Sequence, residues 1–568
     1  MRRLTLAIAT AAALGAFGMG TGTANAAAPL KPTIRTAVAH DVSKPLRDLQ
    51  PLAPDAGTTA VIPERGLVRG SDGRHQRDTA LQTQAVSSAM PAPQFTFEGP
   101  SNQDNFDIFG FRVNPPDPNG DVGQQNYIAM TNLTFAVYTK GGGLLYGPAD
   151  TGTLWQDFPI EDCTDPSGDP VVVYDDVANR WILTQFTTRD PTFYNCVAVS
   201  TTSDPLGPYY RYAFSTGPFF PDYPKYGIMG KGLYITTREF GPTTEYQIGV
   251  YAINRLQIEA GVANPTVVSF YLVDGVDPLY LLGDGILPAD QDGKRLPPSS
   301  SREYFTGTMD DGAFYGAPFD AINFFTANIN WSSPGLSTFA LTKQLHTDPF
   351  DSIYPCGGSA GQTSRDCLEQ PGVPLTANNL LDILSYRQRP TFRLQYRNFG
   401  DHESLVTSQS VQARDAAVDG YNQAGMRWYE LRKPTDPVIH QQGTWAPNDG
   451  VHRWMGSIGM DRLGNMAVGY SVVNGSNVYP GIRYAGRLAG DALGQITQGE
   501  QTLQAGNGIQ TTANSRWGDY TSMNVDPKDD CTFYYINEYY PVSGTAADGR
   551  PWHTRIGAFK FPSCRTGS

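Results

Sequence analysis

The sequence predicts an all-β protein, a β-propeller of about seven four-stranded blades, with six or eight blades as the alternatives. Three observations predict it: a composition typical of turn-rich β structure, a repeated set of four short apolar segments, and the spacing of six cysteines. A pair of β-sandwiches is the competing fold, because it also uses short strands joined by turns.

Composition indicates the fold class before any motif is considered. The 568 residues include 60 Gly, 43 Pro, 30 Tyr and 27 Phe, whereas charged residues make up only 17% of the chain. Aromatic residues favour strands, and Gly and Pro favour the turns between them. The formal net charge is -13 and no basic stripe is visible, which argues against a nucleic-acid partner.

One repeated unit shows the content of a single blade. After Gly168-Asp169-Pro170 come the segments VVVYD (171–175), WILTQFTT (181–188), CVAVSTT (196–202) and YYRYAFS (209–215). Four short strands joined by hairpins make one propeller blade. Similar units open at Tyr226, Arg453 and Arg516, and less regular ones near Asp121, near Tyr304 and at His402.

The N-terminal region predicts export. Arg2 and Arg3 precede an apolar run that ends at Ala24-Asn25-Ala26, the pattern of a signal peptide over residues 1–26. Residues 27–93 are rich in Ala, Pro, Thr and Gln and predict a disordered linker or pro-segment, dispensable for stability. We therefore expect a secreted protein, extracellular or periplasmic, with one propeller domain over residues 94–564 and no membrane span.

The last unit supplies only three segments before Cys564. The strand Gln94–Glu98 is therefore predicted to pair with it and close the ring, because an unpaired edge is a liability. The cysteines are expected to bridge positions at the same end of a blade, although six cysteines allow fifteen pairings. The expected pairs are Cys163–Cys196, Cys356–Cys367 and Cys531–Cys564.

Several long motifs carry a resemblance to known proteins. They include NPPDPNGDVG (114–123), GDPVVVYD (168–175), LQYRNFGDHESLV (394–406) and RWGDYTSMNVDPKDDCTFYY (516–535). The chain resembles, over most of residues 100–564, a family of large secreted bacterial β-propeller-like proteins of uncharacterised function. Some members are fused to adhesion-type or polycystic-kidney-disease-type repeats. The resemblance implies no catalytic residue.

One loop has the pattern of a calcium site. Asp117, Asn119 and Asp121 place oxygen atoms at positions one, three and five of a glycine-containing loop, as calcium prefers. The pattern is not an EF-hand, because Val122 and Ile128 occupy its sixth and twelfth positions. A turn held by side-chain hydrogen bonds is the alternative. Calcium is the one cofactor that the sequence suggests, and Asp290-Gln-Asp292-Gly293 is a weaker instance.

Polar and aromatic residues recur where the first strands of successive units begin. In a propeller these positions surround the axis on one face, so they become neighbours whatever their separation in sequence. The set comprises Asp169, Tyr223, Lys225, His402, Glu403, Arg453, Trp454, Arg516, Trp517, Asp519 and Tyr520. The alternative is that repeated Arg-Trp and Gly-Asp pairs only lock adjacent blades together.

The residue types in this set suit a sugar. We expect Glu403, Asp519 and His402 to act as acid or base, and Arg453 and Arg516 to hold a carboxylate. Rings that could stack on a sugar are those of Trp454, Trp517 and Tyr520.

Two functions remain open at this level. One is a carbohydrate-active hydrolase or lyase with its site at the axial mouth. The other is a non-catalytic module that binds an extracellular glycan or cell-surface ligand. No G-x-S-x-G, H-E-x-x-H or P-loop motif is present to name a reaction, and the oligomeric state is left open.

Overall fold

The computed structural model describes residues 29–52, 70–71, 76–84, 86, 88–189, 191–242, 246–299, 302–356, 366–373, 380–383, 388–511, 515–544 and 551–565. The predicted signal peptide lies outside the described residues. The described chain is all-β, with four short α-helices. These are α1 (Asn102–Phe109), α2 (Arg255–Glu259), α3 (Leu279–Leu282) and α4 (Ala416–Asp419). None of the described helices is long and apolar enough to cross a membrane.

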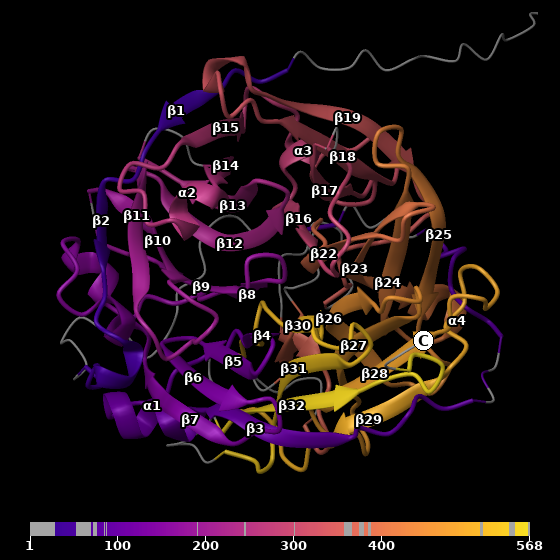
Figure 1. Cartoon of the computed structure of the whole chain (residues 1–568). Helices are drawn as coiled ribbons and strands as arrows, with labels where there is room; N and C mark the ends of the chain where they lie inside the picture. Colours follow the sequence, from indigo (N-terminus) through magenta and orange to yellow (C-terminus); the bar gives the residue numbers. More distant parts are fainter. Residues whose placement is uncertain are drawn as a thin grey trace, which may run out of the picture.

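The four- and five-stranded sheets are arranged around a common centre, each with one edge strand innermost (Figure 1). Two sheets consist of four strands that follow one another in the chain. The first contains β4 (Asn119–Val122), β5 (Asn126–Thr131), β6 (Thr134–Thr139) and β7 (Leu144–Asp150). The other contains β26 (His452–Met460), β27 (Met466–Val473), β28 (Gly481–Arg487) and β29 (Glu500–Gln504).

Two sheets have a fifth strand from the N-terminal region at their outer edge. One contains β8 (Val172–Asp175), β9 (Arg180–Phe186), β10 (Phe193–Ser200), β11 (Tyr209–Gly217) and then β2 (Ala39–Val42). The other contains β12 (Phe220–Met229), β13 (Gly232–Phe240), β14 (Gln247–Asn254), β15 (Val267–Val273) and then β1 (Thr33–Arg35).

An eight-stranded sheet consists of two antiparallel halves joined by a parallel pair, β16 with β22. One half contains β16 (Leu287–Gln291), β17 (Glu303–Met309), β18 (Ala321–Asn328) and β19 (Thr338–His346). The other contains β22 (Thr391–Asn398), β23 (Glu403–Arg414), β24 (Gln423–Arg432) and β25 (Val438–Trp445). A separate two-stranded sheet pairs β20 (Asp366–Leu368) with β21 (Leu381–Asp382).

The unit starts predicted at Tyr304 and His402 are wrong by one strand. Tyr304 lies in β17 and His402 precedes β23, so each stands before or in the second strand of its half. The true first strands, β16 and β22, carry several charged or polar side chains that obscure their β pattern. Those charges face the centre of the ring rather than a hydrophobic layer, as described below.

The ring closes as predicted. β3 (Phe95–Ser101) pairs antiparallel with β32 (His553–Phe559), and Phe95 lies opposite Ala558. The remaining strands of that sheet are β31 (Phe533–Tyr539) and β30 (Ser522–Val525). The first strand of the domain thus completes the last sheet.

The prediction of a disordered linker over residues 27–93 is wrong for its described parts. β1 pairs with β15, and β2 pairs with β11, so the segment covers two outer edges that would otherwise be exposed. Further along, Leu81 forms a bridge to Thr444 of β25. The low hydrophobicity of the segment misled the prediction, because edge pairing uses backbone groups and needs few apolar side chains.

Hydrophobic side chains fill the space between neighbouring sheets. In β8, Val172 packs in one cluster with Ile128 of the preceding sheet, whereas Val173 packs in another with Ile228 of the following sheet. Because successive strand residues point to opposite faces, a strand covered on both sides needs apolar residues at every position. This explains why the segment VVVYD is apolar without alternation.

All three predicted disulfides are present. Their Cα–Cα separations are 6.0 Å for Cys163–Cys196, 5.1 Å for Cys356–Cys367 and 5.6 Å for Cys531–Cys564. No described cysteine is free. Three bridges are consistent with a secreted protein, because disulfides persist in oxidising compartments.

Candidate functional site

A group of charged and aromatic residues meets at the end of the ring where the inner strands begin. We name it the lysine cluster. It comprises Asp117, Asp169, Tyr223, Lys225, Arg389, Arg516, Asp519 and Tyr520. Six of these residues lie just before an inner strand (β4, β8, β22 or β30), and Tyr223 and Lys225 lie within β12.

The backbone turns sharply at three of these positions. Asp117, Asp169 and Tyr223 have φ values of 46°, 45° and 52°. Positive φ is uncommon for aspartate and a true outlier for a bulky residue such as tyrosine. Such strain persists where surrounding contacts hold it and clusters at functional sites. The recurrence at one end of three inner strands suggests that the turns serve to aim side chains at the axis.

Asp519 connects two arginines. One carboxylate oxygen lies 3.2 Å from Nη2 of Arg389, and the other lies 2.9 Å from Nη2 of Arg516. The Asp519 backbone N–H also donates to Oδ1 of Asp117 at 2.7 Å. The Asp519 side chain is 18% exposed, whereas those of Arg389 and Arg516 are 2% and 8% exposed.

Lys225 has a different environment from these arginines. It is 1% exposed, and its Nζ lies 3.0 Å from the ring centroid of Tyr223 and 3.6 Å from that of Tyr520. Among the described residues, Lys225 makes one hydrogen bond, to the backbone carbonyl of Pro224 at 3.3 Å. No carboxylate of the described residues lies within ion-pair distance of this ammonium group.

Burial decides the protonation of the cluster. Burial, and then the nearby charge of Arg389, hold the pKa of Lys225 well below its usual value. Burial and the neighbouring Asp519 raise the pKa of Asp117 to about 6. Burial also raises the pKa of Asp169 well above its usual value, although Tyr520 donates a hydrogen bond to its Oδ2 at 3.0 Å. Burial therefore favours the uncharged amine of Lys225 and the protonated forms of Asp117 and Asp169.

A second charged group lies near the other ends of the inner strands. We name it the arginine cluster: Asp290, Asp292, Arg393, Gln395, Arg397 and Asp530. Arg393 contacts both Asp290, at 3.0 Å, and Asp292. Arg397 pairs with Asp530 at 2.6 Å. Each arginine thus has a carboxylate partner, and Gln395 donates a further hydrogen bond to Asp292 at 2.5 Å.

His402 and Glu403 do not join the lysine cluster, contrary to the prediction. They follow β22, whereas Arg389 of the lysine cluster precedes it, and an eight-residue strand spans roughly 26 Å. His402 lies 2.9 Å from Asp401 and stacks on Phe399, and Glu403 accepts a hydrogen bond from Tyr396 at 2.5 Å. The error follows from taking β23 for a first strand.

Arg453 also lies outside the lysine cluster. Its guanidinium group pairs with Asp449 at 2.7 Å and with Glu500 of the outer strand β29 at 2.8 Å. The side chain therefore runs away from the axis and lines a lateral cavity of about 580 Å³, together with Trp445.

The two tryptophans that follow Arg453 and Arg516 in the sequence pack inside the protein. Trp454 and Trp517 are 0% and 2% exposed, and their rings lie 5.1 Å apart in a hydrophobic cluster. The indole N–H of Trp517 donates to Ser471 at 3.0 Å. Of the predicted set, Asp169, Tyr223, Lys225, Arg516, Asp519 and Tyr520 meet in the lysine cluster.

The predicted calcium loop makes hydrogen bonds to neighbouring sheets. Asn119 accepts from the backbone N–H of Val172 at 2.9 Å, and Asp121 accepts from that of Tyr174 at 2.8 Å. These contacts join β4 to β8. They are the bonds expected of a structural turn, and calcium binding by Asp117, Asn119 and Asp121 stays a prediction.

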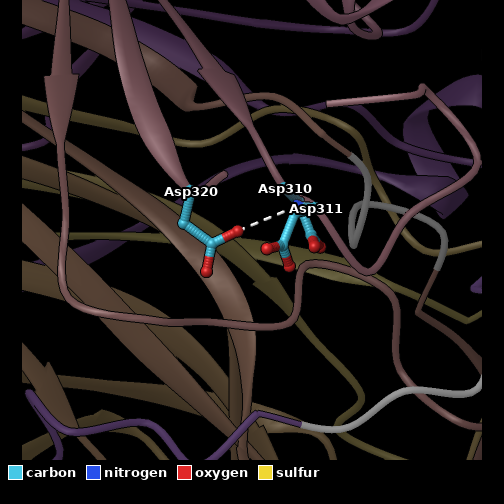
Figure 2. Close-up of side chains that lie close together, drawn as sticks. All are labelled: Asp310, Asp311 and Asp320. Carbon is cyan, nitrogen blue, oxygen red and sulfur yellow. Dashed lines mark hydrogen bonds between the residues drawn. The ribbon is translucent and has the colours of Figure 1, made fainter. Parts of the chain in front are cut away.

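Another acidic group, Asp310, Asp311 and Asp320, brings three carboxylates together within 4.8 Å of one another (Figure 2). The Asp311 backbone N–H donates to Oδ1 of Asp320 at 2.9 Å, as drawn in the figure. The oxygens of Asp310 accept from the backbone of Gly312 at 2.7 Å and of Ser352 at 2.6 Å. Backbone donors therefore account for the closeness of these carboxylates.

Sequence reasoning missed Arg389, although it completes the lysine cluster. It stands in RQRP (387–390), next to a proline and far from any repeated motif. Its Cζ lies 3.8 Å from the ring centroid of Tyr223, so it stacks on the same ring that Lys225 contacts. If β22 had been recognised as a first strand, the position of Arg389 just before it would have placed this arginine in the predicted set.

Comparison with known proteins gives structural matches alone. No protein-family model and no curated relative matches the chain. An α-L-arabinofuranosidase of Fusarium graminearum is similar at a TM-score of 0.35 with 11% identity, over 69% of this chain and 94% of that one. An α-L-arabinanase of Penicillium chrysogenum gives 0.34 with 8% identity, over 83% and 99%. The polysaccharide lyase Uly1 gives 0.34 with 8% identity, over 80% and 91%.

Proposed function

We propose that the protein is a secreted glycan-active enzyme whose site is the lysine cluster, and that it cleaves a uronate-containing glycan by elimination. The observation that carries the proposal is Lys225, a buried lysine that contacts two tyrosine rings and no carboxylate among the described residues. A buried lysine loses its proton readily and can then act as a base near neutral pH.

We infer that the ring is a seven-bladed propeller. Five sheets and the two halves of the eight-stranded sheet provide seven groups of four antiparallel strands, which supports this count. In that arrangement the lysine cluster lies at one mouth of the axis. An axial mouth is a site to which every blade can contribute a side chain.

Each part of the cluster has a role in an elimination. The carboxylate of a uronate would bind Arg389 and Arg516, whose planar donors suit that group. The amine of Lys225 would accept the proton from the carbon next to the carboxylate. A carbon–carbon double bond then forms as the bond to the leaving glycosidic oxygen breaks. That oxygen takes a proton from a protonated carboxyl, for which Asp117 is suited because burial raises its pKa to about 6.

Hydrolysis is the second candidate reaction. It requires two carboxyl groups, one protonated and one ionised. Asp117 and Asp519 are adjacent, and burial with the charge of Asp519 favours the protonated form of Asp117. We prefer elimination because it uses Lys225 as the base, whereas hydrolysis by two carboxyl groups needs neither Lys225 nor the two tyrosine rings that it contacts.

A non-catalytic binding module is the remaining alternative. The nearly complete burial of Lys225, Arg389 and Tyr520 supports it, because little of the cluster meets solvent. In that case the charges would hold the blades together and the glycan would lie above them, near Asp519.

A polysaccharide screen tests these alternatives with one set of samples. The protein is incubated with glycans that contain uronates and with neutral glycans. Ultraviolet absorbance detects the double bond that elimination leaves, and a reducing-end assay detects every cleavage. Elimination predicts both signals from uronate glycans alone. Reducing ends without the double bond would assign hydrolysis, and binding without any new ends would assign the non-catalytic module.

Variants locate the activity. Lys225→Met is expected to abolish the double-bond signal while leaving the thermal midpoint equal or higher. Lys343→Met is the matched control, because the Lys343 side chain is 40% exposed and pairs with the exposed Asp436. Full activity in Lys225→Met would remove the proposal for this site.

A further inference from the structure

A cavity of about 580 Å³ opens at the end of the ring opposite the lysine cluster. It lies between the β12–β15 sheet and the β16–β19 half. Its walls come from the hairpin at Lys231, the helix α2 at Leu256, the loop at Leu296 and the segment after β18 at Trp331. The volume falls within the range of small-molecule sites.

Apolar side chains dominate the walls. Leu256 and Leu296 are 48% and 52% exposed, and Val177, which also lines the cavity, is 44% exposed. Tyr234 and Trp331 add aromatic rings. Single exposed apolar residues are common on protein surfaces, whereas a group of them around a cavity indicates a binding site.

The charge at the cavity is opposite to that of the whole chain. Lys231 and Arg302 line the cavity and are exposed. Arg255 also lines it, but its guanidinium is occupied by Asp175 and by Glu259, the latter at 3.0 Å. Two cations are therefore available at the rim of a cavity in a protein whose formal net charge is -13.

The carboxyl group at the cavity does not cancel this positive charge. Glu303 is 3% exposed, and no side chain of the described residues donates a hydrogen bond to it. Burial, and then the charge of Asp290, raise the pKa of Glu303 well above its usual value. Burial therefore favours the neutral form of Glu303, and Lys231 and Arg302 are the exposed charged residues that line the cavity.

We propose that this cavity binds a small amphipathic anion, with an apolar ring-bearing body packed between Trp331 and Leu256 and one acidic group held by Lys231 and Arg302. The site is separate from the lysine cluster and does not depend on the proposed enzymatic function. Shape and apolar lining select the body of the ligand, and the two cations select its charge.

Two fluorescent probes that differ by one charged group test the proposal on the full secreted chain. Anilinonaphthalene sulfonate is an aromatic anion, and phenylnaphthylamine has the same aromatic body without the sulfonate. We expect saturable binding of the sulfonate to one site on the folded protein. The neutral probe should bind about tenfold more weakly, because two exposed ion pairs contribute about 0.2–1 kcal/mol each.

Variants separate the apolar and the charged contributions. The double variant Lys231→Glu/Arg302→Glu should weaken the sulfonate at least tenfold and leave the neutral probe unchanged. Trp331→Ala should weaken both probes. Lys343→Glu is the control for a charge reversal at an exposed lysine outside the cavity and should change neither.

Three outcomes would overturn the proposal. Equal affinity for the two probes would show that charge does not select the ligand. Sulfonate binding that survives both cavity variants would place the probe elsewhere. Fluorescence that rises only as the protein unfolds, followed by circular dichroism in the same samples, would show that the folded cavity binds nothing.

Discussion

The lysine cluster lies where the inner strands begin and the arginine cluster lies further along the inner strands, yet the two clusters satisfy their charges in different ways. In the arginine cluster, Arg393 lies beside Asp290 of β16, and Arg397 lies beside Asp530 of the connection between β30 and β31. In the lysine cluster, Lys225 lies between tyrosine rings, and the nearby Asp519 is taken up by Arg389 and Arg516.

Under the proposed function, this difference separates a structural role for the arginine cluster from a chemical role for the lysine cluster. A buried cation with a carboxylate partner keeps its proton, and removing it leaves an uncompensated charge. A buried amine without such a partner reduces its cost by losing its proton, which makes it a base. Similar residues at the two mouths of one axis can therefore serve opposite purposes.

The largest effect is expected from Arg393→Met. The change leaves Asp290 buried without its counter-ion and leaves Asp292, among the described residues, only the 3.9 Å ion pair to Arg397. Removing one partner of a buried pair costs about 3–5 kcal/mol in comparable sites. The thermal unfolding midpoint at a fixed scan rate should fall by several degrees. Arg555→Met is the control, because Arg555 pairs with the half-exposed Glu98 and should lower the midpoint little. Equal losses would remove the structural role of the arginine cluster.

A smaller effect is expected at Glu500, an ion-paired carboxylate away from the axis. Burial opposes its ionisation, but Arg453 and Arg483 outweigh burial and hold its pKa at about 2. Its stabilisation is therefore present above the unfolded pKa of about 4.5 and is lost as the pH falls through 2. Glu500→Gln should cost up to about 3 kcal/mol at neutral pH. Denaturant titrations should show this cost disappearing near pH 2, and a cost that does not change with pH would contradict it.

Lys225→Met is expected to stabilise the protein, whereas the two substitutions above destabilise it. Because burial lowers the folded pKa of Lys225, folding displaces a proton below the unfolded pKa of 10.5 and loses stability there. The variant should be more stable than the parent at neutral pH, by about 1 kcal/mol after the new side chain packs. The gain should shrink as the pH approaches 10.5. Destabilisation at neutral pH would show that Lys225 is paired in solution and would erase the contrast between the clusters.

The smallest effect concerns calcium. Weak binding through Asp117, Asn119 and Asp121 would stabilise the protein by about 0.4 kcal/mol when calcium equals its Kd. Thermal scans with calcium and with a chelator should show a small shift that Asp121→Asn abolishes. The same shift in the variant would assign calcium elsewhere, and Asp320→Asn would then test the second acidic group.

Local sequence determined much of the fold. The segment VVVYD specifies a strand buried on both faces, because no polar side chain interrupts it between residues 171 and 174. The missing fourth segment of the last unit identified the strand at Phe95 as its partner. The disulfides followed from strand order, since antiparallel neighbours bring the ends of a sheet together.

Only the tertiary structure decided which charges meet. Arg389 and Arg393 are four residues apart, yet Arg389 pairs with Asp519, which precedes β30, and Arg393 reaches Asp292, which follows β16. Arg453 was expected at the axis and instead reaches Glu500 on an outer strand. A long flexible side chain pairs with whichever opposite charge lies near it in the folded protein. A first strand rich in charged residues lacks the usual apolar pattern, so its place at the axis becomes visible only in the tertiary structure. The sequence therefore specified the apolar layers between the sheets, whereas the protonation of Lys225 depends on neighbours that folding alone provides.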